Sequence, residues 1–260
     1  MRSITLNFAF GFITCVAMPS TPSPPNQMLG SDARIEHLVR DSYTFKAFLN
    51  EDDIRANCTG GVVTLTGTVA HEYHKQLILE TTVGIPGVRG VTSRLILAGD
   101  QPLACSDHWI TMRVEAILFL HKYIRASGVH VFTESGLVTL TGTANTEIQK
   151  QLVTDWAKDI EGVEEVLNHL VVARPETVHR MVQGLPVDDA SLRAQVKVAL
   201  LYHKSTHLLT SHVVSQGGVV TLSGEVESGA QYDQVSRLVD NIHGVAWVNN
   251  RMTVREQKRP

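Results

Sequence analysis

Histidine is the residue type in this sequence best suited to chemistry, because imidazole binds metals and titrates near neutral pH. The chain has 12 histidines, and two pairs, His71 with His74 and His203 with His207, have spacings that place both rings on one face of a helix. A closed zinc-type site needs four ligands, and the sequence places no third or fourth ligand near either pair. It therefore predicts surface histidines and no metal site.

Known catalytic motifs are absent from the sequence. It contains no Gly-x-Ser-x-Gly elbow, no phosphate-binding loop, no His-Glu-x-x-His and no Cys-x-x-Cys. Serine and threonine are concentrated in a repeated Thr-Leu-Thr-Gly phrase, where the alternation of a strand accounts for them as the outward face of a hairpin. The sequence thus predicts a protein that is not an enzyme and that uses no cofactor.

Two cysteines outside the N-terminal region, Cys58 and Cys105, form an even pair. We expect Cys58 on a strand and Cys105 in a linker between two repeated segments, so a disulfide would connect those segments. An oxidising compartment would permit such a bond. Two free thiols are the alternative, and the sequence does not decide between them.

A phrase of seven residues occurs three times and shows how the chain is organised. It reads Gly-Val-Val-Thr-Leu-Thr-Gly at 61–67, Gly-Leu-Val-Thr-Leu-Thr-Gly at 136–142 and Gly-Val-Val-Thr-Leu-Ser-Gly at 218–224. The closing glycines are 75 and 82 residues apart, which suits a small domain better than a solenoid turn or a propeller blade. These three glycines, Gly67, Gly142 and Gly224, indicate a bulge or a close approach of backbone.

The similarity extends on both sides of the phrase without a gap, over 66 residues. The alignment puts His203 at the position of His121 and Lys46, which indicates a solvated basic position. Linkers of nine and sixteen residues, 98–106 and 173–188, hold Pro and Gly, which interrupt regular structure. We therefore define three tandem units, which are unit 1 at 32–97, unit 2 at 107–172 and unit 3 at 189–254.

Each unit opens on an aspartate followed by apolar residues at helical spacing, which predicts an N-capped amphipathic helix. The capping residues would be Asp32, Asp107 and Asp189. In units 2 and 3 the apolar spacing continues along the helix, whereas unit 1 matches only its opening, with Ile35 and Val39.

Alternating β-branched residues around the repeated phrase predict a β-hairpin that turns at a glycine. A second helix and a last strand follow it in each unit. The fold class is therefore α+β, with three αββαβ domains, each a three-stranded sheet covered on one face by two helices. The second helix is expected to end at a glycine that tolerates left-handed backbone, which is Gly87, Gly162 or Gly244.

Charge argues against one class of partner. Unit 1 has 7 basic and 8 acidic residues and unit 2 has 5 and 9, while residues 188–260, which contain unit 3 and its flanks, have 8 and 7. None of these is the strongly basic module typical of nucleic-acid binding, so we expect no nucleic-acid partner. Only the third segment carries a net positive charge.

The repeated phrase, followed twenty residues later by a Gly-Val that opens a last strand with an Asn, resembles the BON domain of bacterial envelope proteins. Unit 3 fits with Gly244-Val245 and Asn249, and unit 2 with Gly162-Val163 and Asn168, whereas unit 1 has Ser93 in place of Asn168. The resemblance, which extends to osmotically inducible periplasmic proteins, implies an αββαβ fold, an envelope location and association with phospholipid. It implies no catalytic residues.

Residues 1–31 have the pattern of a signal peptide and a Pro-rich leader. Met1-Arg2 precedes an uncharged, mostly apolar run that ends at Met18, too short to span a bilayer comfortably, and cleavage after Ala17 would fit. Cys15 as a lipoprotein acceptor is the alternative. We therefore expect a periplasmic protein.

The function predicted from these observations is a non-enzymatic exported envelope protein that binds phospholipid or a membrane surface in osmotic stress. A structural protein whose units dock on each other or on a protein partner is the alternative. The candidate membrane contacts are seven of the eight basic residues of unit 3 and the tail, Arg193, Lys197, Lys204, Arg251, Arg255, Lys258 and Arg259.

Overall fold

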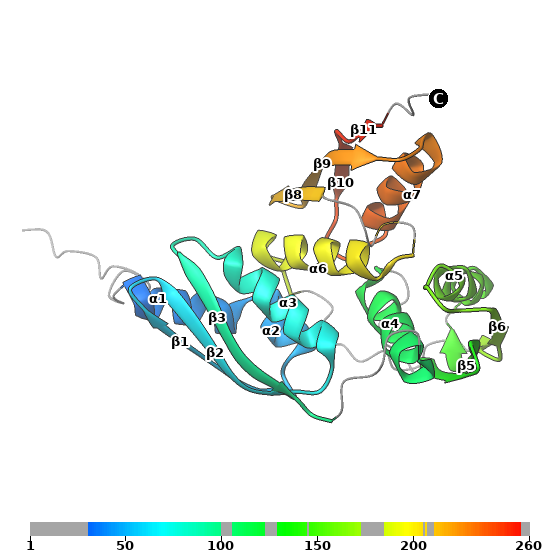
Figure 1. Ribbon diagram of the computed structural model, residues 1–260, viewed down its shortest axis with the longest axis horizontal. Helices are drawn as coiled ribbons and strands as arrows, with labels where there is room; N and C mark the ends of the chain where they lie inside the picture. The colour runs from blue at the N-terminus through cyan, green and yellow to red at the C-terminus, as the bar shows by residue number, and fades with distance from the viewer. Residues whose placement is uncertain are drawn as a thin grey trace, which may run out of the picture.

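The computed structural model shows three small α+β units, each with its own sheet (Figure 1). Among the described residues no strand pairs with a strand of another unit, and the predicted α+β fold class is confirmed. The residues that the structure describes are 31–99, 106–122, 129–144, 146–172, 185–204, 206 and 211–255. Residues 1–30 of the predicted leader, Cys105, His207, Lys258 and Arg259 lie outside them.

Unit 1 contains a hairpin of β1 and β2, and α3 connects β2 to a third strand that pairs with it in parallel. The central strand is therefore β2, and its residues Val63, Leu65 and Val69 face the helices and are fully buried. The elements are α1 (Ser31–Asp41), α2 (Tyr43–Phe48), β1 (Asp53–Thr59), β2 (Val62–Val69), α3 (Glu72–Val83) and β3 (Gly90–Leu97).

Units 2 and 3 repeat this arrangement, with the last strand interrupted in the middle. The central strands are β5 and β9. Unit 2 comprises α4 (Asp107–Leu120), β4 (Val129–Glu134), β5 (Leu137–Ala144), α5 (Glu147–Lys158), β6 (Glu165–Asn168) and β7 (Val171–Val172). Unit 3 comprises α6 (Asp189–Tyr202), β8 (Ser211–Gln216), β9 (Val219–Val226), α7 (Gly229–Asp240), β10 (Trp247–Asn250) and β11 (Thr253–Val254).

The first helix of unit 1 is broken at Ser42, where units 2 and 3 have one continuous helix. The Ser42 hydroxyl donates to the carbonyl of Val39 at 2.7 Å and accepts from the backbone N–H of Phe45 at 3.3 Å. A side chain that bonds local backbone in this way competes with a continuous helix. The break explains why the helical spacing of unit 1 stops at Val39.

The prediction that the opening aspartates cap the first helices is wrong. Ser106 and Asp188, each one residue earlier, cap α4 and α6 by accepting the N–H of Trp109 and of Ser191. The opening aspartates lie inside the first turn, and their carboxylates reach the hairpin turn of the same unit. They accept turn N–H groups at distances of 2.8 to 3.1 Å, from Gly60 and Gly61 to Asp32, from Ser135 and Gly136 to Asp107, and from Gly217 to Asp189.

The second helices also end before the predicted glycines, at Val83, Lys158 and Asp240. Each glycine lies in a later turn that is closed by an N–H of the next valine to the carbonyl of an isoleucine, at 3.2 to 3.3 Å. Positive φ at the third residue of such a turn is a position that glycine occupies without strain. The φ values are +97° at Gly87, +88° at Gly162 and +92° at Gly244.

The closing glycines of the repeated phrase also have positive φ, +120° at Gly67, +112° at Gly142 and +140° at Gly224. A Cβ atom at Gly67 would collide with the backbone carbonyl of Asp53 on β1. A side chain is therefore excluded there by the neighbouring strand as well as by the backbone angle.

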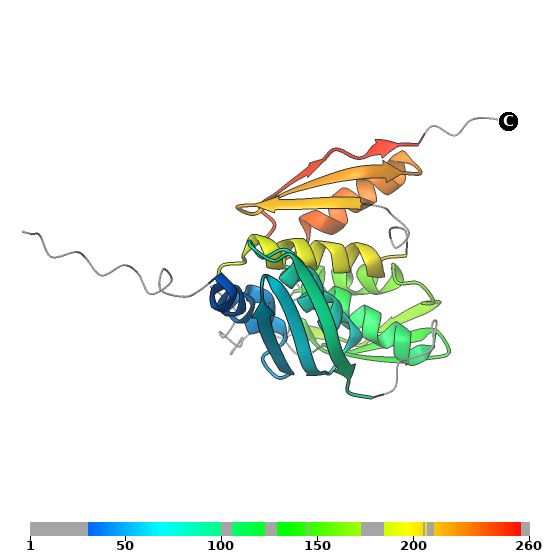
Figure 2. The same cartoon turned by 60° about the vertical axis from the view of Figure 1, so that its left-hand side comes forward.

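The three units pack around α6, which crosses the middle of the molecule and contacts both α3 of unit 1 and α4 of unit 2 (Figures 1 and 2). Their buried side chains form one continuous core, which compensates for the small core that a single unit of this size can bury. Each sheet keeps one face away from this core. In the described part of the chain, no helix has the length and apolar character needed to cross a bilayer.

Candidate functional site

The outer face of the unit 3 sheet, made by β8, β9 and β10, is the strongest candidate for a functional surface. Strand alternation creates it, because Val220, Leu222 and Val226 of β9 point into the core with at most 1% exposure. The residues that alternate with them, Val219, Thr221 and Ser223, therefore point outward.

Strand register arranges this outer face into three rows across the sheet. The first two rows contain three exposed apolar side chains, with exposed fractions of 68% at Trp247, 45% at Val214 and 40% at Val219. The rows are Gln216–Val219–Trp247, Val214–Thr221–Asn249 and His212–Ser223, with Arg251 following on the edge strand.

Two predicted membrane contacts, Arg251 and Arg255, lie along this edge. The Arg251 guanidinium lies beside the Asn249 amide, and Arg255 forms an exposed ion pair of 3.0 Å with Glu225 on β9. Basic and apolar side chains thus share one face of unit 3, a combination typical of surfaces that meet lipid headgroups.

The equivalent faces of the other units differ in character. In unit 2 the positions of Gln216 and Trp247 are taken by Glu134 and Glu165, which flank the centre of the sheet. In unit 1 the position of Trp247 is taken by Gly90. Unit 3 is therefore the unit that combines an exposed tryptophan with arginines on this face.

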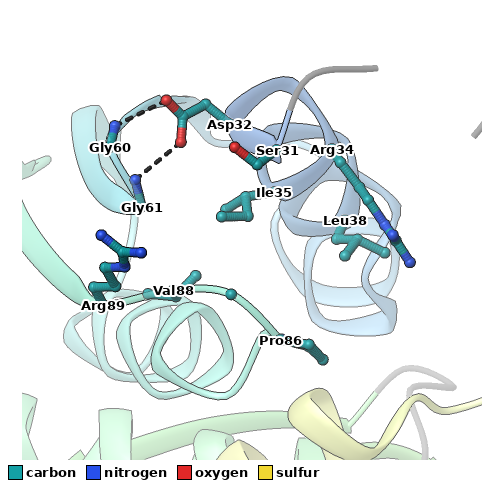
Figure 3. A pocket seen from close by; sticks show the side chains of 11 residues that line it. Ser31, Asp32, Arg34, Ile35, Leu38, Gly60, Gly61, Pro86, Val88 and Arg89 are labelled. Atoms are coloured by element: carbon teal, nitrogen blue, oxygen red, sulfur yellow. Dashed lines mark hydrogen bonds between the residues drawn. The ribbon is translucent and has the colours of Figure 1, made fainter. Parts of the chain in front are cut away.

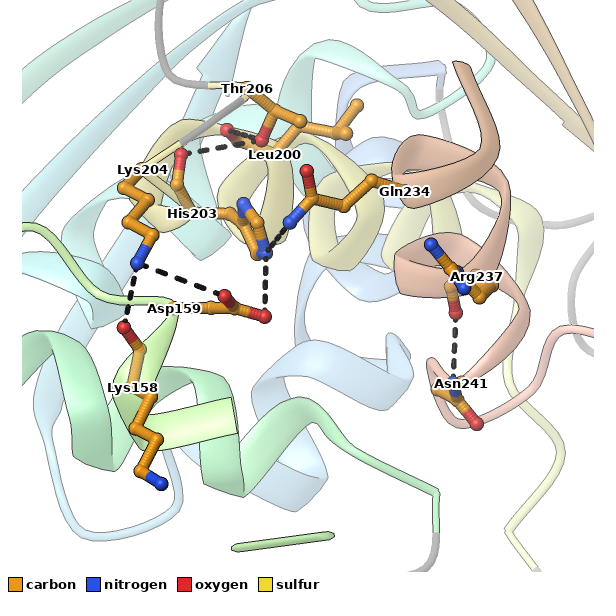
Figure 4. Close-up of polar contacts among 9 residues, drawn as sticks. All are labelled: Lys158, Asp159, Leu200, His203, Lys204, Thr206, Gln234, Arg237 and Asn241. Carbon is orange, nitrogen blue, oxygen red and sulfur yellow. Dashed lines mark hydrogen bonds and ion pairs between the residues drawn. The ribbon is translucent and has the colours of Figure 1, made fainter. Parts of the chain in front are cut away.

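Lys204 lies at the contact between units 2 and 3 (Figure 4). Its backbone N–H donates to the carbonyl of Asp159 at 3.1 Å, and its ammonium donates to the carbonyl of Lys158 at 3.0 Å. The same contact occurs in the reverse sense, since the backbone N–H of Lys122 donates to the carbonyl of Asn241 at 2.8 Å. Units 2 and 3 are thus joined through equivalent residues on both sides.

The prediction that His203 and His121 are solvated is wrong. Both are only 2% exposed and form the two isolated bridges of this contact, with Ile160 and Ile242 respectively. Lys46, the unit 1 counterpart, is exposed and pairs with Asp41 at 2.9 Å. The repeat alignment located the position correctly but could not show that another unit covers it.

Arg193 and Lys197 lie at the contact between units 1 and 3. The Lys197 ammonium donates to Glu80 on α3 at 2.7 Å, and the Arg193 guanidinium packs over Gly84 so closely that a Cβ there would clash with it. These two residues, with Lys204, therefore contact other units and lie apart from the outer face that carries Arg251 and Arg255.

The histidine and cysteine candidates have local partners. His74 Nδ1 lies 2.6 Å from Asp52, and its ring is in contact with that of His71 at 5.1 Å between centroids. The Cys58 thiol donates to Asp32 at 3.3 Å, and burial raises its pKa. Among the described residues no group of three or more side chains is placed to bind a metal.

Sequence reasoning missed Trp247 and Val214, because the alternating pattern was used only to find the core. The available signal was the apolar residues at outward positions of the predicted strands. Such side chains are ordinary when single and informative when strand register gathers them.

The family model of the BON domain matches residues 31–99, 106–174 and 188–256. The osmotically-inducible protein Y of Escherichia coli is 31% identical over 149 residues, which are 57% of this chain and 73% of that protein. The outer membrane lipoprotein DolP of Haemophilus influenzae is 29% identical over 136 residues, which are 52% of this chain and 68% of that protein.

An uncharacterised protein of Anaplasma centrale is 25% identical over 152 residues, 58% of this chain and 97% of that protein. Among solved structures, the C-terminal domain of CdsD, a structural protein of the type III secretion system of Chlamydia trachomatis, is similar at 16% identity with a TM-score of 0.23, covering 85% of this chain and 96% of that one. A TM-score this low supports no conclusion about the fold or the function of this chain.

Proposed function

Because this chain belongs to the BON domain family, with three copies of the domain, we propose that it is an exported, non-enzymatic envelope protein that binds a phospholipid surface in osmotic stress. The family relatives support the envelope and the stress, since one is named osmotically inducible and another is an outer membrane lipoprotein. The contact with phospholipid is the outer face of the unit 3 sheet.

The observation that carries this proposal is that Trp247, at the start of β10, and Arg251, directly after its end, lie along the same edge and outer face of the sheet. Tryptophan partitions to the membrane–water interface, and each basic group near an anionic surface contributes about 1 kcal/mol. Val219 beside Trp247 on β9, and Val214 on β8, add apolar area to the same face. Binding of this kind is weak and sensitive to salt.

In this proposal the predicted membrane contacts divide into residues that join the units and residues that remain available to a membrane. Arg193, Lys197 and Lys204 hold the units together, so we assign them to the stability of the assembly. Arg251 and Arg255 remain as membrane contacts. Lys258 and Arg259, which follow them in sequence, remain proposed contacts on the basis of their charge alone.

A second candidate function, a structural interaction protein, is favoured by the continuous core that joins the three units. In that case the docking of units is the purpose of the repeat, and lipid is irrelevant. The two functions differ in what they require of Trp247 and Arg251, which contribute nothing to the contacts between units.

Vesicle pelleting distinguishes the two candidate functions. The protein used begins at residue 18, because cleavage is predicted after Ala17. The variants Arg251→Glu and Trp247→Glu are compared with wild type on phosphatidylethanolamine vesicles with and without phosphatidylglycerol. Arg94→Glu is the matched control, because Arg94 occupies the position of Arg251 in the unit 1 repeat and is also exposed.

Charge reversal at Arg251 is expected to weaken binding to the anionic vesicles by about tenfold or more, because it replaces an attraction by a repulsion. Trp247→Glu should weaken it similarly, and Arg94→Glu should change it by less than about twofold, since a single distant charge is screened. Equal losses for Arg94→Glu and Arg251→Glu would reject the unit 3 face, and no binding by wild type would favour the structural function.

A further inference from the structure

The outer face of the unit 2 sheet is an exposed surface that the proposed membrane contact does not use. Phe132 on β4 is 63% exposed and Leu167 on β6 is 37% exposed. Strand register places them in the middle of three rows, which are Glu134–Leu137–Glu165, Phe132–Thr139–Leu167 and His130–Thr141, with His169 following on the edge strand. The face is therefore apolar in the middle and acidic at the end where the hairpin turns.

The acidic end of this face is fixed in position, and its charges are unpaired. Asp107 accepts two N–H groups of the hairpin turn that follows Glu134, at 2.8 and 3.0 Å. Figure 3 shows the equivalent contact in unit 1, which Asp32 makes. In the part of the chain that the structure describes, neither Glu134 nor Glu165 forms an ion pair. Two carboxylates are thus available to a basic surface.

The outer face of the unit 3 sheet has the opposite charge. Its positive group, Arg251, lies in the third row from the hairpin turn, and among the described residues it has no carboxylate partner. The other arginine, Arg255, is already paired with Glu225. Two unit 2 faces would bring their carboxylates together, and two unit 3 faces would repel through Arg251. A unit 2 face and a unit 3 face attract each other.

The two faces also match in the order of their rows. Sheets that pack face to face lie about 10 Å apart with their strands nearly aligned. If the two hairpins point in opposite directions, β4 lies over β8, β6 lies over β10, and the order of the rows is reversed. Glu165 then lies over Arg251, and Phe132 lies over Val214. A single arrangement thus pairs the free charges and buries the exposed apolar side chains.

We propose that the outer face of unit 2 docks on the outer face of unit 3 of a second copy of this chain. The helices of units 2 and 3 lie between their sheets, so these two faces of one copy point away from each other (Figures 1 and 2). The contact therefore joins unlike surfaces and continues from copy to copy in a chain or ring, without closing on a dimer. It goes beyond the proposed membrane contact, and lipid and a second copy exclude each other on unit 3.

Sedimentation equilibrium of the same protein, without lipid, measures this association. The variants are Glu165→Arg, Arg251→Glu and the double variant that carries both changes. The matched controls are Asp155→Arg, on an exposed position of α5 in unit 2, and Arg94→Glu, on the outer face of unit 1. Because no lipid is present, the outcome is independent of whether unit 3 binds a membrane.

We expect the average mass of wild type to rise as the concentration approaches about 1 mM, since a contact of one small sheet face is weak, and to rise less at high salt. Each single charge reversal should weaken the association by about tenfold or more, because it places like charges opposite each other. The controls should change it by less than about twofold. The double variant should regain most of the association, because the exchanged charges again attract.

A wild type that stays monomeric at this concentration would overturn the proposal. So would a double variant that associates no better than the single variants, or controls that lose as much as the two face variants. A loss in Arg251→Glu without a loss in Glu165→Arg would also overturn it, in favour of a contact between two unit 3 faces.

Discussion

His203 Nε2 lies 3.4 Å from a carboxylate oxygen of Asp159 across the contact between units 2 and 3. On the opposite side of this contact, the equivalent residues are His121 and Asn241, so an amide stands where Asp159 provides a charge. Both histidines are almost fully buried. The contact is therefore symmetric in its backbone and asymmetric in its charge.

We predict that acid weakens the folded protein through His121. Burial, and secondarily the charge of Lys122, lower its pKa to about 4 from 6.5. The unfolded chain takes up the proton first, so stability is complete above pH 6.5 and is lost as the pH falls toward 4. The loss is at most about 3 kcal/mol, from 1.36 kcal/mol per pKa unit.

Urea unfolding at pH 7 and pH 4.5 tests this prediction. His121→Phe keeps a ring against Trp156, whose centroid is 4.7 Å away, and should reduce the difference between the two pH values. His37→Phe, at an exposed histidine, is the control and should leave the difference unchanged. An unchanged difference in His121→Phe would contradict the assignment.

Lys197 and Glu80 are predicted to stabilise the contact between units 1 and 3. Both side chains are about one third exposed, at 36% and 33%, so the pair is partly screened and contributes about 1 kcal/mol or less. Lys197→Glu should lower the melting temperature through repulsion, and Glu80→Lys combined with it should restore most of the loss. If the double variant is no more stable than Lys197→Glu, the ion pair does not support the contact.

Gly142 and Thr141 are neighbours with opposite tolerance for a β-branched side chain. Gly142→Val places valine at φ of +112° and should cost about 1 to 3 kcal/mol from backbone strain alone. Thr141→Val, at an exposed position, should change stability by less than about 0.5 kcal/mol. Thermal unfolding measures both, and equal melting temperatures would count against a special role for the glycine.

Asp107→Asn is predicted to destabilise unit 2. The N–H groups of Gly136 and Ser135 lower the pKa of the Asp107 carboxyl below 3.8, because they bond the charged form. Its contribution is thus present above pH 3.8 and is lost as the pH falls below it. The melting temperature of the variant should lie below that of wild type at pH 7, and the gap should narrow in acid, whereas Asp155→Asn should show no such gap.

The sequence by itself determined the unit and its fold. Three copies of one phrase, aligned without a gap, gave the number of domains, and the periods of two and 3.6 residues gave the order of strands and helices. In unit 1 the helical spacing stops at Val39, but the sequence did not predict the break that the structure has at Ser42. These signals are local, because each depends on residues within one unit.

Only the tertiary structure decided what the charged and polar side chains do. Asp32 and Asp107 looked like helix caps, yet their carboxylates bond turns 28 and 29 residues away in the chain. His203 looked like a surface residue, yet another unit covers it, and Lys204, although exposed, bonds to the backbone of that unit. Such roles depend on how units pack, and packing brings together residues whose separation in sequence carries no periodic signal.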